Sequence, residues 1–555
     1  MRRTNNIGVL ALGLASSIRG ILADLTWPSA YDEIEDIMFL NNGYNAREFP
    51  ILLQPCTIVK EPGHSIAAGL IRTAFHDMAP HNAYTGVGGV DASIGFELDS
   101  SIYPTNTGIA FNNTMHFYSQ FFNGRAPMAD LVNVGLYQAV RACGGPIVPV
   151  RAGRVDATGP GPVGVPQPTD PIPQMIGEFR RMGFSPEEMI AMVACGHSIG
   201  GVHSAEHPDI VPPYTTPLGV QDLDSTNATF DNAVVTEYLD GTTQNPLVVG
   251  ANPAAYSDGR IFGLNNRRTV SALADPNAYA NTCSGILAKM VNTVPNGVQL
   301  SDVIAPYELK PSNLQLNVAA DGQTLQFTGE LRIHTNSLPS SSISSVQVVY
   351  KDRTGAASDA YTIAASVLGD ANGFDDTFTF YGFEGTIPAL TSISSFTVIV
   401  TLTSGSTQTF DNNGQGYPIS DAIFTQTSYS SLAATDGSGN QQLTVFAAAR
   451  NSETYGPVTL SVDLINPITY NNLPTVSSVP TPMTSVCAGQ YYTFYSATFG
   501  VPAAGANFTK YDVSASCNGA TVSDSFNSLA GLPLTASATP SCGAAPSKRA
   551  VNFSA

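Results

Sequence analysis

The sequence changes its pattern near Pro306, and this change constrains the fold more than any other feature. Before it, apolar residues recur at helical spacing. After it, short alternating apolar runs such as Phe396–Val400 lie between turns rich in Gly, Asn and Asp. Helical spacing favours helices packed on a core, and alternation favours half-buried strands. We therefore predict a multidomain chain, with a mainly α part followed by an all-β, sandwich-like part of seven or eight strands.

Four segments are expected along the 555 residues. Residues 1–23 resemble an export signal, because Arg2 and Arg3 precede a short apolar stretch and small residues lead up to Ala23. Residues 24–303 form the helical domain, 304–530 the β domain and 531–555 a loose tail. Each of the two domains is long enough to form its own core, so we predict two separate cores.

Acidic residues outnumber basic ones, with 43 Asp and Glu against 24 Lys and Arg and a net charge of -19. Such a surface repels phosphate backbones, so no nucleic-acid partner is expected. No later stretch approaches the about 20 apolar residues of a membrane span, so we also expect no membrane contact and a secreted, extracellular protein. Four glycosylation sequons agree with export: Asn112, Asn227, Asn507 and Asn552.

Seven cysteines are typical of an oxidising compartment, and their odd number leaves at least one without a partner in the chain. Connectivity cannot be read from the spacing. The expected pairs are Cys56 with Cys143, Cys195 with Cys283, and two of Cys487, Cys517 and Cys542.

Arg72 and His76 lie four residues apart in an apolar segment that begins near Ser65. A helix places both side chains on one face, and that face would be buried. Because a buried Arg and a buried His need polar partners, a polar pocket is favoured. The alternative is a core histidine with a structural ion pair.

A second helix is predicted from Ser185, which can cap it, with Pro186 at its first position and Glu188 completing a capping box. This helix carries His197 into the interior, where it is again either a core residue or a ligand. Together the two histidines allow a cofactor between helices, with one histidine on a metal and the other free for acid–base work. Asp258 is a candidate carboxylate for orienting the ligand histidine.

Four motifs follow one another in the first half. They are Arg72-x-x-Phe75-His76-Asp77, Gly88-Gly89-x-Asp91-x-Ser93, Cys195-x-His197-Ser198-x-Gly200 and Asp224-x-Thr226-x-x-x-Phe230-Asp231. In this order they resemble the plant and fungal haem peroxidase superfamily, above all its secreted fungal members. The resemblance covers residues 24–298. It implies a secreted haem peroxidase that reduces hydrogen peroxide and oxidises small aromatic, chiefly phenolic, donors in one-electron steps.

The resemblance assigns six residues to a haem b cofactor: Arg72, Phe75, His76 and Asn106 on the distal side, and His197 and Asp258 on the proximal side. It implies that His76 transfers protons, that Asn106 accepts a hydrogen bond from it and that Arg72 stabilises developing charge. It also implies that His197 binds the haem iron and that Asp258 is its carboxylate partner.

The resemblance further implies two Ca²⁺ sites built from oxygen ligands. The distal set is Asp77, Gly89, Asp91 and Ser93, and the proximal set is Ser198, Asp224, Thr226, Thr229 and Asp231. Each set includes the residue directly after one of the two histidines, so calcium would hold both helices in place.

Some family features are missing. Ser65, Gly69 and His203 stand at the three acidic positions of manganese-oxidising members. Met192 stands where high-potential members carry a surface tryptophan. We therefore expect neither a manganese site nor that tryptophan relay. Ser100 replaces the acidic residue six positions before Asn106, which predicts different hydrogen-bond support for the distal loop.

Two other functions are compatible with parts of the sequence. His203-Ser-Ala-Glu206-His207 matches the H-x-x-E-H zinc-peptidase motif, but Pro208 follows directly and disfavours a long ligand-bearing helix. The other is a non-catalytic cell-wall or polysaccharide-binding protein on a peroxidase scaffold. Four tyrosines of the β part are either a carbohydrate platform or ordinary core residues: Tyr470, Tyr491, Tyr492 and Tyr495.

Overall fold

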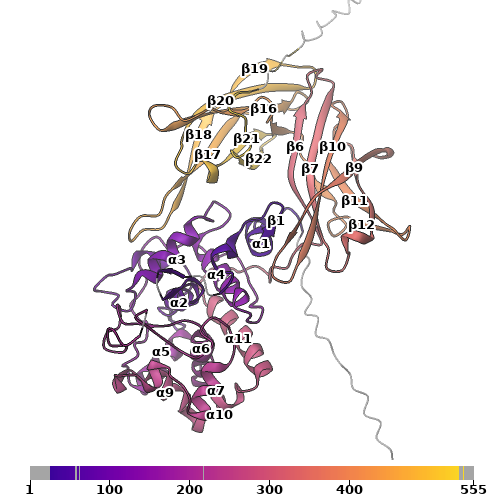
Figure 1. The fold of residues 1–555 in the computed structure, drawn as a ribbon. Helices are drawn as coiled ribbons and strands as arrows, with labels where there is room; N and C mark the ends of the chain where they lie inside the picture. The colour runs from indigo at the N-terminus through magenta and orange to yellow at the C-terminus, as the bar shows by residue number, and fades with distance from the viewer. Residues whose placement is uncertain are drawn as a thin grey trace, which may run out of the picture.

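The computed structural model describes residues 26–56, 59–61, 63–216, 218–536, 540 and 542. The expected export signal, most of the expected tail and the sequon at Asn552 lie outside the described residues. A helical region at one end is followed by a stack of β-sheets at the other (Figure 1). The predicted order, mainly α and then all β, is confirmed.

The helical region contains α1 to α11, with short strands between them. The helices are α1 (Asp32–Phe39), α2 (Ile66–Met78), α3 (Ile109–Ser119), α4 (Met128–Ala142), α5 (Ile172–Met182), α6 (Pro186–Gly196), α7 (Ala233–Asp240), α8 (Pro246–Val249), α9 (Ser257–Phe262), α10 (Arg268–Ala272) and α11 (Pro276–Val291). The strands are β1 (Asn42–Gly43), β2 (Val59–Glu61), β3 (His64–Ser65), β4 (Gly201–His203) and β5 (Val220–Asp222).

The two helices predicted to carry the site begin where their capping residues place them. The Ser185 hydroxyl accepts a hydrogen bond from the Glu188 amide at 3.2 Å, and the Glu188 carboxylate accepts one from the Ser185 amide at 2.8 Å. This capping box starts α6, as predicted. Ser65 caps α2 in a similar way by accepting from the Ala68 amide.

Disulfides fasten the helical region at two points and the β region at one. The pairs are Cys56–Cys143, Cys195–Cys283 and Cys487–Cys542. Cys517 is a free, buried thiol. The two pairs expected in the first half are confirmed, and the choice among the last three cysteines is settled.

A large antiparallel sheet forms the first layer of the β region. Its strands are β6 (Leu309–Val318), β7 (Thr324–His334), β8 (Ile343–Lys351), β9 (Ala357–Asn372), β10 (Thr377–Pro388), β11 (Ser395–Leu402), β12 (Thr407–Phe410) and β13 (Tyr417–Pro418). Their order is β12-β11-β8-β9-β10-β7-β6, with β13 beside β11. β1 of the helical region pairs with β9, through Asn42 opposite Asn372.

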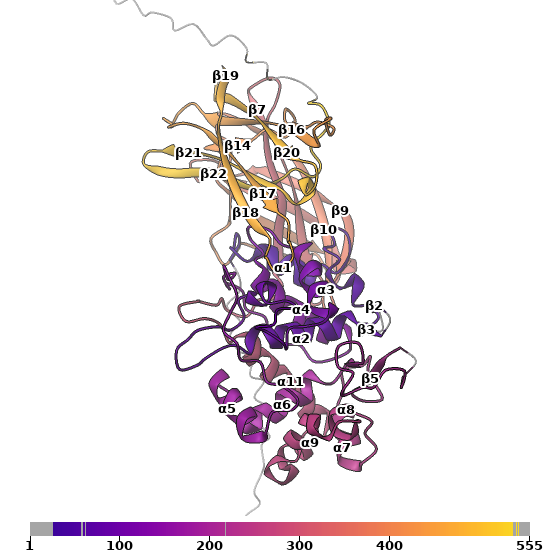
Figure 2. The same cartoon turned by 90° about the vertical axis from the view of Figure 1, so that its left-hand side faces the viewer.

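Two smaller sheets complete the β region (Figure 2). The second contains β14 (Ile423–Thr425), β15 (Ser431–Leu432), β16 (Asn440–Arg450), β19 (Thr484–Ala488) and β20 (Tyr492–Pro502). The third contains β17 (Thr459–Asn466), β18 (Thr475–Pro482), β21 (Lys510–Cys517) and β22 (Ala520–Ser528).

The prediction of one sandwich of seven or eight strands is wrong, because the second sheet is buried on both faces. Val445 and Ala447 of β16 pack in the core shared with the third sheet. Ala448, the next residue, packs in the core shared with the first sheet. A strand covered on both sides loses the alternation from which the sandwich was predicted.

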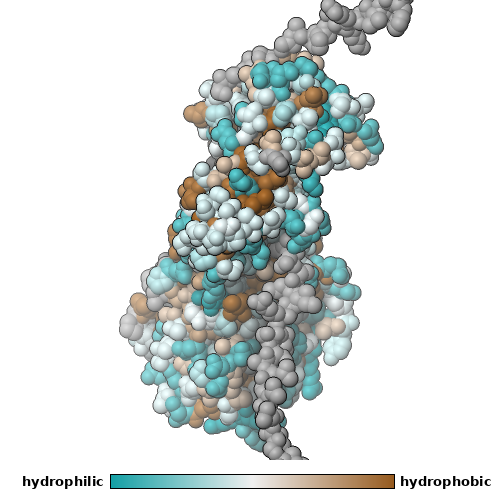
Figure 3. All heavy atoms as spheres, turned by 90° about the vertical axis from the view of Figure 1, so that its right-hand side faces the viewer, coloured by the Kyte–Doolittle hydropathy of each residue, from teal (hydrophilic) through white to brown (hydrophobic). Residues whose placement is uncertain are grey.

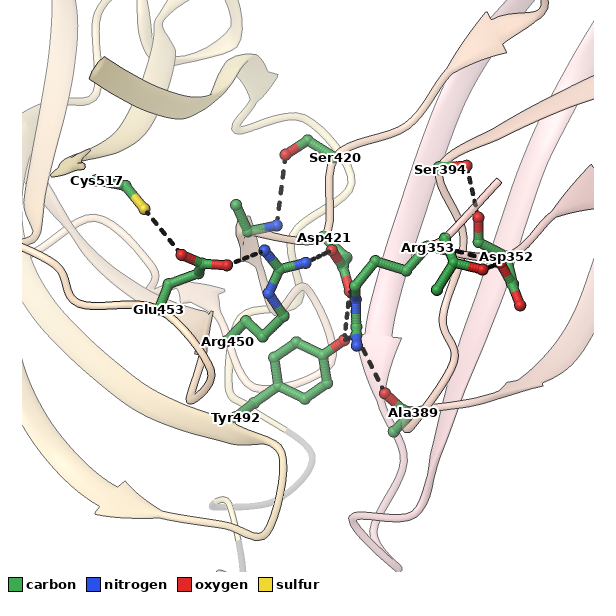
Figure 4. Close-up of polar contacts among 12 residues, drawn as sticks. Asp352, Arg353, Ala389, Ser394, Ser420, Asp421, Arg450, Glu453, Tyr492 and Cys517 are labelled. Carbon is green, nitrogen blue, oxygen red and sulfur yellow. Dashed lines mark hydrogen bonds and ion pairs between the residues drawn. The ribbon is translucent and has the colours of Figure 1, made fainter. Parts of the chain in front are cut away.

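A polar cluster around Asp421 connects the first two sheets (Figure 4). Its buried carboxylate accepts hydrogen bonds from Arg353 at 2.8 Å, from Arg450 at 2.7 Å and from the Tyr492 hydroxyl at 3.0 Å. Arg353 lies between β8 and β9, whereas Arg450 and Tyr492 belong to the second sheet. The shared carboxylate therefore fixes these layers against each other.

A buried ion cluster connects α1 to the first sheet. Lys310 of β6 and Arg332 of β7 both pair with Glu35 and with Asp36 of α1. Glu35 is fully buried, and the Arg332 side chain is 1% exposed. Phe378 and Phe380 of β10 belong to the hydrophobic core of the helical region. The helical core thus continues into the β region, whereas the sequence predicts two separate cores.

The surface is mixed in character. On the face that Figure 3 shows, apolar residues gather over part of the β region. Exposed large apolar side chains include Val367 and Leu368 of β9. Among the described helices, none combines the length and the hydropathy needed to cross a membrane.

Candidate active site

A cleft of about 290 Å³ is lined by residues of α2 and α6. Its apolar lining includes Ile71, Phe75, Met175, Phe179, Met192, Val193 and Ile261. Arg72, His76, His197 and Asp258 line the same cleft. The structure therefore brings the predicted distal and proximal residues together around one largely apolar space, a composition typical of a small-molecule or cofactor site.

The imidazole of His76 is held in one tautomer. Its Nδ1 lies 2.9 Å from Oδ1 of Asn106, and the Asn106 amide nitrogen donates to Glu97 Oε2 at 2.7 Å. Because the carboxylate requires a donor, the amide oxygen must face His76, and Nδ1 must carry the proton. Burial and the nearby charge of Arg72 lower the pKa of His76 to about 3. The ring is neutral, and its Nε2 is left as a proton acceptor.

Glu97 is a site residue that the sequence analysis missed. It is fully buried, and its second carboxylate oxygen accepts a hydrogen bond from the Gly161 amide at 2.8 Å. Burial raises the pKa of Glu97 to about 7. The support of Asn106 does differ in position, as expected from Ser100: the carboxylate that accepts from Asn106 comes from Glu97. A lone acidic residue in the apolar run Ile94–Leu98 was the signal available in the sequence.

Arg72 lies one helical turn before His76, as predicted. Its guanidinium stands 4.4 Å from the centre of the Phe111 ring. It makes no hydrogen bond or ion pair with the residues that the structure describes. Burial lowers the pKa of Arg72 to about 10, against an opposing effect of Glu206, so the group stays charged at neutral pH. Phe75, half-buried, forms part of the cleft wall beside Phe179.

His197 follows the last residue of α6, and its side chain is 35% exposed toward the cleft. Its Nδ1 lies 2.8 Å from Oδ2 of the fully buried Asp258. Burial lowers the pKa of His197, but the Asp258 carboxylate outweighs burial and holds the pKa above its usual value. Nδ1 therefore donates to Asp258, and Nε2 is the nitrogen left for a ligand.

Two neighbours hold the Asp258 carboxylate. The Asn245 amide nitrogen donates to Oδ2 of Asp258 at 2.9 Å, and the Ser257 hydroxyl donates to Oδ1 at 3.1 Å. Neither was a candidate from the sequence. Asn245 lies 13 residues before Asp258 and has no motif around it, so only the folded chain shows its role.

The zinc motif is not assembled as the sequence suggests. His203 and Glu206 lie near His64 rather than His207, and the rings of His64 and His203 are parallel at 3.7 Å. Lone pairs of imidazole nitrogens lie in the ring planes, so those of parallel rings do not converge on one ion. His203 belongs to β4, not to a helix. His203, Glu206 and His207 are among the residues that line the cleft. The metal-binding arrangement that the zinc-peptidase motif predicts, with His203 and His207 on one ion, is not formed.

The distal oxygen set forms a loop around Asp77. One carboxylate oxygen of Asp77 accepts from the amides of Asp91 and Ala92, and the other accepts from Ile94. Burial, together with the neighbouring Asp91, raises the pKa of Asp77 well above its usual value. Gly89 has a φ of 121°, and the Ser93 amide donates to Asp91. Gly89, Asp91 and Ser93 thus lie in one loop, and amides of that loop bind Asp77 at the end of α2.

The proximal oxygen set is gathered as well. Thr226 donates its hydroxyl to Asp231 at 2.9 Å and its amide to Asp224 at 2.9 Å, and the Ser198 hydroxyl donates to the Asp231 carbonyl. The amide of Thr229 closes the turn on the Thr226 carbonyl. Oδ2 of Asp224 is buried without a hydrogen-bond partner among the described residues. Burial raises the pKa of Asp224 to about 7, with Asp231 adding to the effect.

The four tyrosines do not form a carbohydrate platform. Tyr492 is 1% exposed in the core between the first two sheets, and Tyr495 packs against the core between the second and third. Tyr491 is half-buried against the core between the first two sheets. Tyr470 is exposed, but it lies in the β17–β18 hairpin, apart in sequence from the other three tyrosines. The core interpretation is correct for Tyr492 and Tyr495.

The comparisons agree with this geometry. The family described as "Peroxidase" matches residues 57–279. A "WSC domain-containing protein" from the fungus Arthroderma benhamiae is 42% identical over 533 residues, which are 95% of this chain and 71% of the relative. The similarity continues through the β region.

Two relatives with enzyme names match shorter stretches. "L-ascorbate peroxidase 5, peroxisomal" from Arabidopsis thaliana is 28% identical over 193 residues, covering 35% of this chain and 64% of the relative. "Manganese peroxidase 3" from Phlebia radiata is 33% identical over 172 residues, covering 29% and 44%. Two oriented histidines face one cleft, and the matched sequence surrounds both of them. The chain therefore belongs to the peroxidase family.

Proposed function

We propose that the protein is a secreted haem peroxidase that reduces hydrogen peroxide and oxidises small phenolic donors in one-electron steps. One observation carries the proposal. His76 and His197 line the same cleft, and each has its Nδ1 bonded to a fixed partner, Asn106 or Asp258. Each ring therefore keeps Nε2 available, one as a base and the other as a ligand.

The residues of the cleft fit a haem b. The apolar side chains of α5 and α6 suit a flat macrocycle, and Nε2 of His197 suits its iron. The sequence has no C-x-x-C-H attachment motif, so the haem would be held without a covalent bond. When bound, haem would supply the redox chemistry, exchanging electrons with peroxide and donor.

The distal residues would move the protons. Nε2 of His76 takes the proton from one peroxide oxygen and returns it to the other, which leaves as water. Arg72 stabilises the negative charge that the leaving oxygen develops. Asn106 and Glu97 keep the proton on Nδ1, so that Nε2 remains the acceptor. Two phenols, each losing an electron and a proton, balance the reduction of one peroxide to two waters.

The donors are inferred from what lines the cleft. Ser65, Gly69 and His203 offer no carboxylate for manganese. The single tryptophan, Trp27, packs 6.1 Å from Tyr417 in the β region and is no relay to the cleft. Electrons should therefore enter at the mouth of the cleft, which favours compact phenols over bulky non-phenolic aromatics.

We include two bound Ca²⁺ ions in the proposal. The orphaned Oδ2 of Asp224 supports the proximal site, because a cation would satisfy an oxygen that no hydrogen bond satisfies. The paired carboxylates of Asp77 and Asp91 support the distal site. Asp77 directly follows His76, and Ser198 directly follows His197. The two ions would therefore stabilise both sides of the cleft.

Three disulfides support secretion into an oxidising compartment. Polysaccharide contact by the β region is also part of the proposal, but it would have to use residues other than the four tyrosines. A pull-down of the full chain with fungal cell-wall or plant polysaccharide tests this contact.

The activity is tested on the full chain supplied with haem. We expect a Soret band, and we expect His76→Ala to slow the reaction with peroxide by at least about 10²-fold. His116→Ala removes an exposed imidazole from α3 and is the matched control. Absence of the Soret band, or equal peroxide rates in both variants, would contradict the proposed function.

A further inference from the structure

A long hairpin of the third sheet reaches the helical region. Figures 1 and 2 show the β17–β18 hairpin running down toward α3. Its tip, residues 467–474, is a tight turn in which Thr469 pairs with Asn472 and Asn471 adopts a φ of 57°. At this tip, Ile468 packs against the hydrophobic core of the helical region.

Leu473, near the end of the tip, is buried in the helical core. Its side chain is 7% exposed, and it is part of the same hydrophobic cluster as α2 and α4. A Cβ added to Gly95 would lie 2.4 Å from Cδ2 of Leu473, closer than any real contact. The leucine therefore rests directly on the backbone of the 3₁₀ turn Ser93–Phe96, and a side chain at position 95 would displace it.

Tyr470 makes a second contact with the same segment. Its hydroxyl lies 3.3 Å from Oδ2 of Asp99 and 3.5 Å from the Leu98 carbonyl. The tyrosine ring itself is 61% exposed, so burial of the ring does not explain its position. Leu473 and Tyr470 thus hold the segment on both sides of Glu97.

Glu97 connects this segment to the cleft. It accepts the Asn106 amide at 2.7 Å, and Asn106 accepts from His76. The Asp99 amide also donates to the Asn106 carbonyl at 3.1 Å. A displacement of residues 95–99 would therefore move both hydrogen bonds that place Asn106, and His76 with them.

We propose that the β17–β18 tip is a positioning element of the distal site, in which Leu473 and Tyr470 hold residues 95–99 so that Glu97 and Asn106 orient His76. This inference rests on the proposed function. Leu473 and Tyr470 touch no reacting group, and they act through Glu97 and Asn106. The β region thereby contributes to the peroxide step and is not only an attached module.

The first test replaces Leu473 in the haem-loaded full chain. Leu473→Ala should lower the second-order rate with peroxide roughly tenfold or more, because small displacements of a catalytic group have large effects. Leu473→Met keeps the volume and should restore most of the rate. Leu460→Ala is the matched control, since Leu460 lies on β17 but packs between the second and third sheets.

A readout without haem separates positioning from general stability. Hydrogen exchange of the haem-free full chain should speed up at the amides of Asp99 and Asn106 in Leu473→Ala, but not in Leu460→Ala. Comparable melting temperatures for the two alanine variants would make the comparison direct.

A double-substitution cycle tests the contact itself. Gly95→Ala should slow the peroxide reaction because the new methyl collides with Leu473, and adding Leu473→Ala should relieve that collision. Additive losses would overturn the contact. If the wild type reacts with peroxide but Leu473→Ala matches Leu460→Ala, the positioning role is wrong. If the wild type does not react at all, the proposed function fails instead.

Discussion

Arg72 lies one helical turn before His76 on α2, and its charge adds to burial in lowering the pKa of His76 from 6.5 to about 3. A base with a lowered pKa stays neutral until the pH falls close to that value. The acceptor nitrogen that the peroxide reaction needs is therefore available over a wide pH range.

The pH dependence of the peroxide rate follows from this relationship. Protonation of His76 should lower the rate only as the pH approaches the pKa of His76, about 3. Between about pH 5 and pH 8 the group of the distal site that titrates is Glu97, whose pKa is about 7. Arg72→Met should move this acid limb upward, since one cause of the lowered pKa is removed, and should also slow the reaction. Stopped-flow mixing after a pH jump measures both the position of the acid limb and the rate of the peroxide reaction. An acid limb near pH 6.5 that remains in Glu97→Gln would contradict the assignment of His76.

Asp258→Asn should weaken haem binding. The substitution keeps the size of the side chain but removes the negative charge that holds Nδ1–H of His197. Loss of such a partner commonly costs about 10–100-fold in affinity or activity at a metal site. Titration of the haem-free protein with haem, followed by Soret absorbance, measures the change. Asp240→Asn, an exposed carboxylate on α7, should bind haem like the wild type.

Arg332→Met should destabilise the whole protein, not only the first sheet. It removes one of two cations from the fully buried Glu35, and breaking a buried ion pair costs about 3–5 kcal/mol. Chemical denaturation, followed by the circular dichroism signal of the helices, measures the effect. Arg268→Met on exposed α10 is the control. A chain ending near Val303 lacks Lys310 and Arg332 together and should lose still more. Equal denaturation midpoints for the two methionine variants would show that the cluster does not stabilise the helices.

Calcium removal should lower the melting temperature of the wild type, because an ion bound only to the native state stabilises it. Asp224→Asn should reduce this response to chelator, since it alters the site of the orphaned oxygen. The raised pKa of Asp224, about 7, means that protonation competes with calcium as the pH falls. The chelator effect should therefore shrink below neutral pH. Metal analysis that finds no calcium, with no chelator effect, would remove both sites.

Local signals account for what the sequence predicted well. The capping box joins Ser185 to Glu188, and Arg72 lies four residues before His76. Each of these patterns involves residues about one helical turn apart. His197 and Asp258 were candidates from the sequence pattern, and the resemblance assigned their roles. Such features depend on neighbours in the chain, so they can be found without the fold.

Long-range contacts account for what was missed. Glu97 supports Asn106 only because a turn brings it there, and Leu473 meets Gly95 across 378 positions of sequence. The three-sheet stack was missed because β16, buried on both faces, shows no alternation. None of these contacts leaves a periodic pattern, and only Glu97, a lone acidic residue in an apolar run, left a signal in the sequence.

The ion cluster on α1 joins residues that are made at different times during synthesis. Glu35 is made 297 residues before its partner Arg332. At about 5–20 residues per second, the ribosome needs roughly 15 to 60 s to cover that distance. For most of this interval Glu35 and Asp36 lack Lys310 and Arg332, the cations with which they pair in the folded protein. α1, the first of the described helices to be translated, can therefore complete this ion cluster only after β7 has been made.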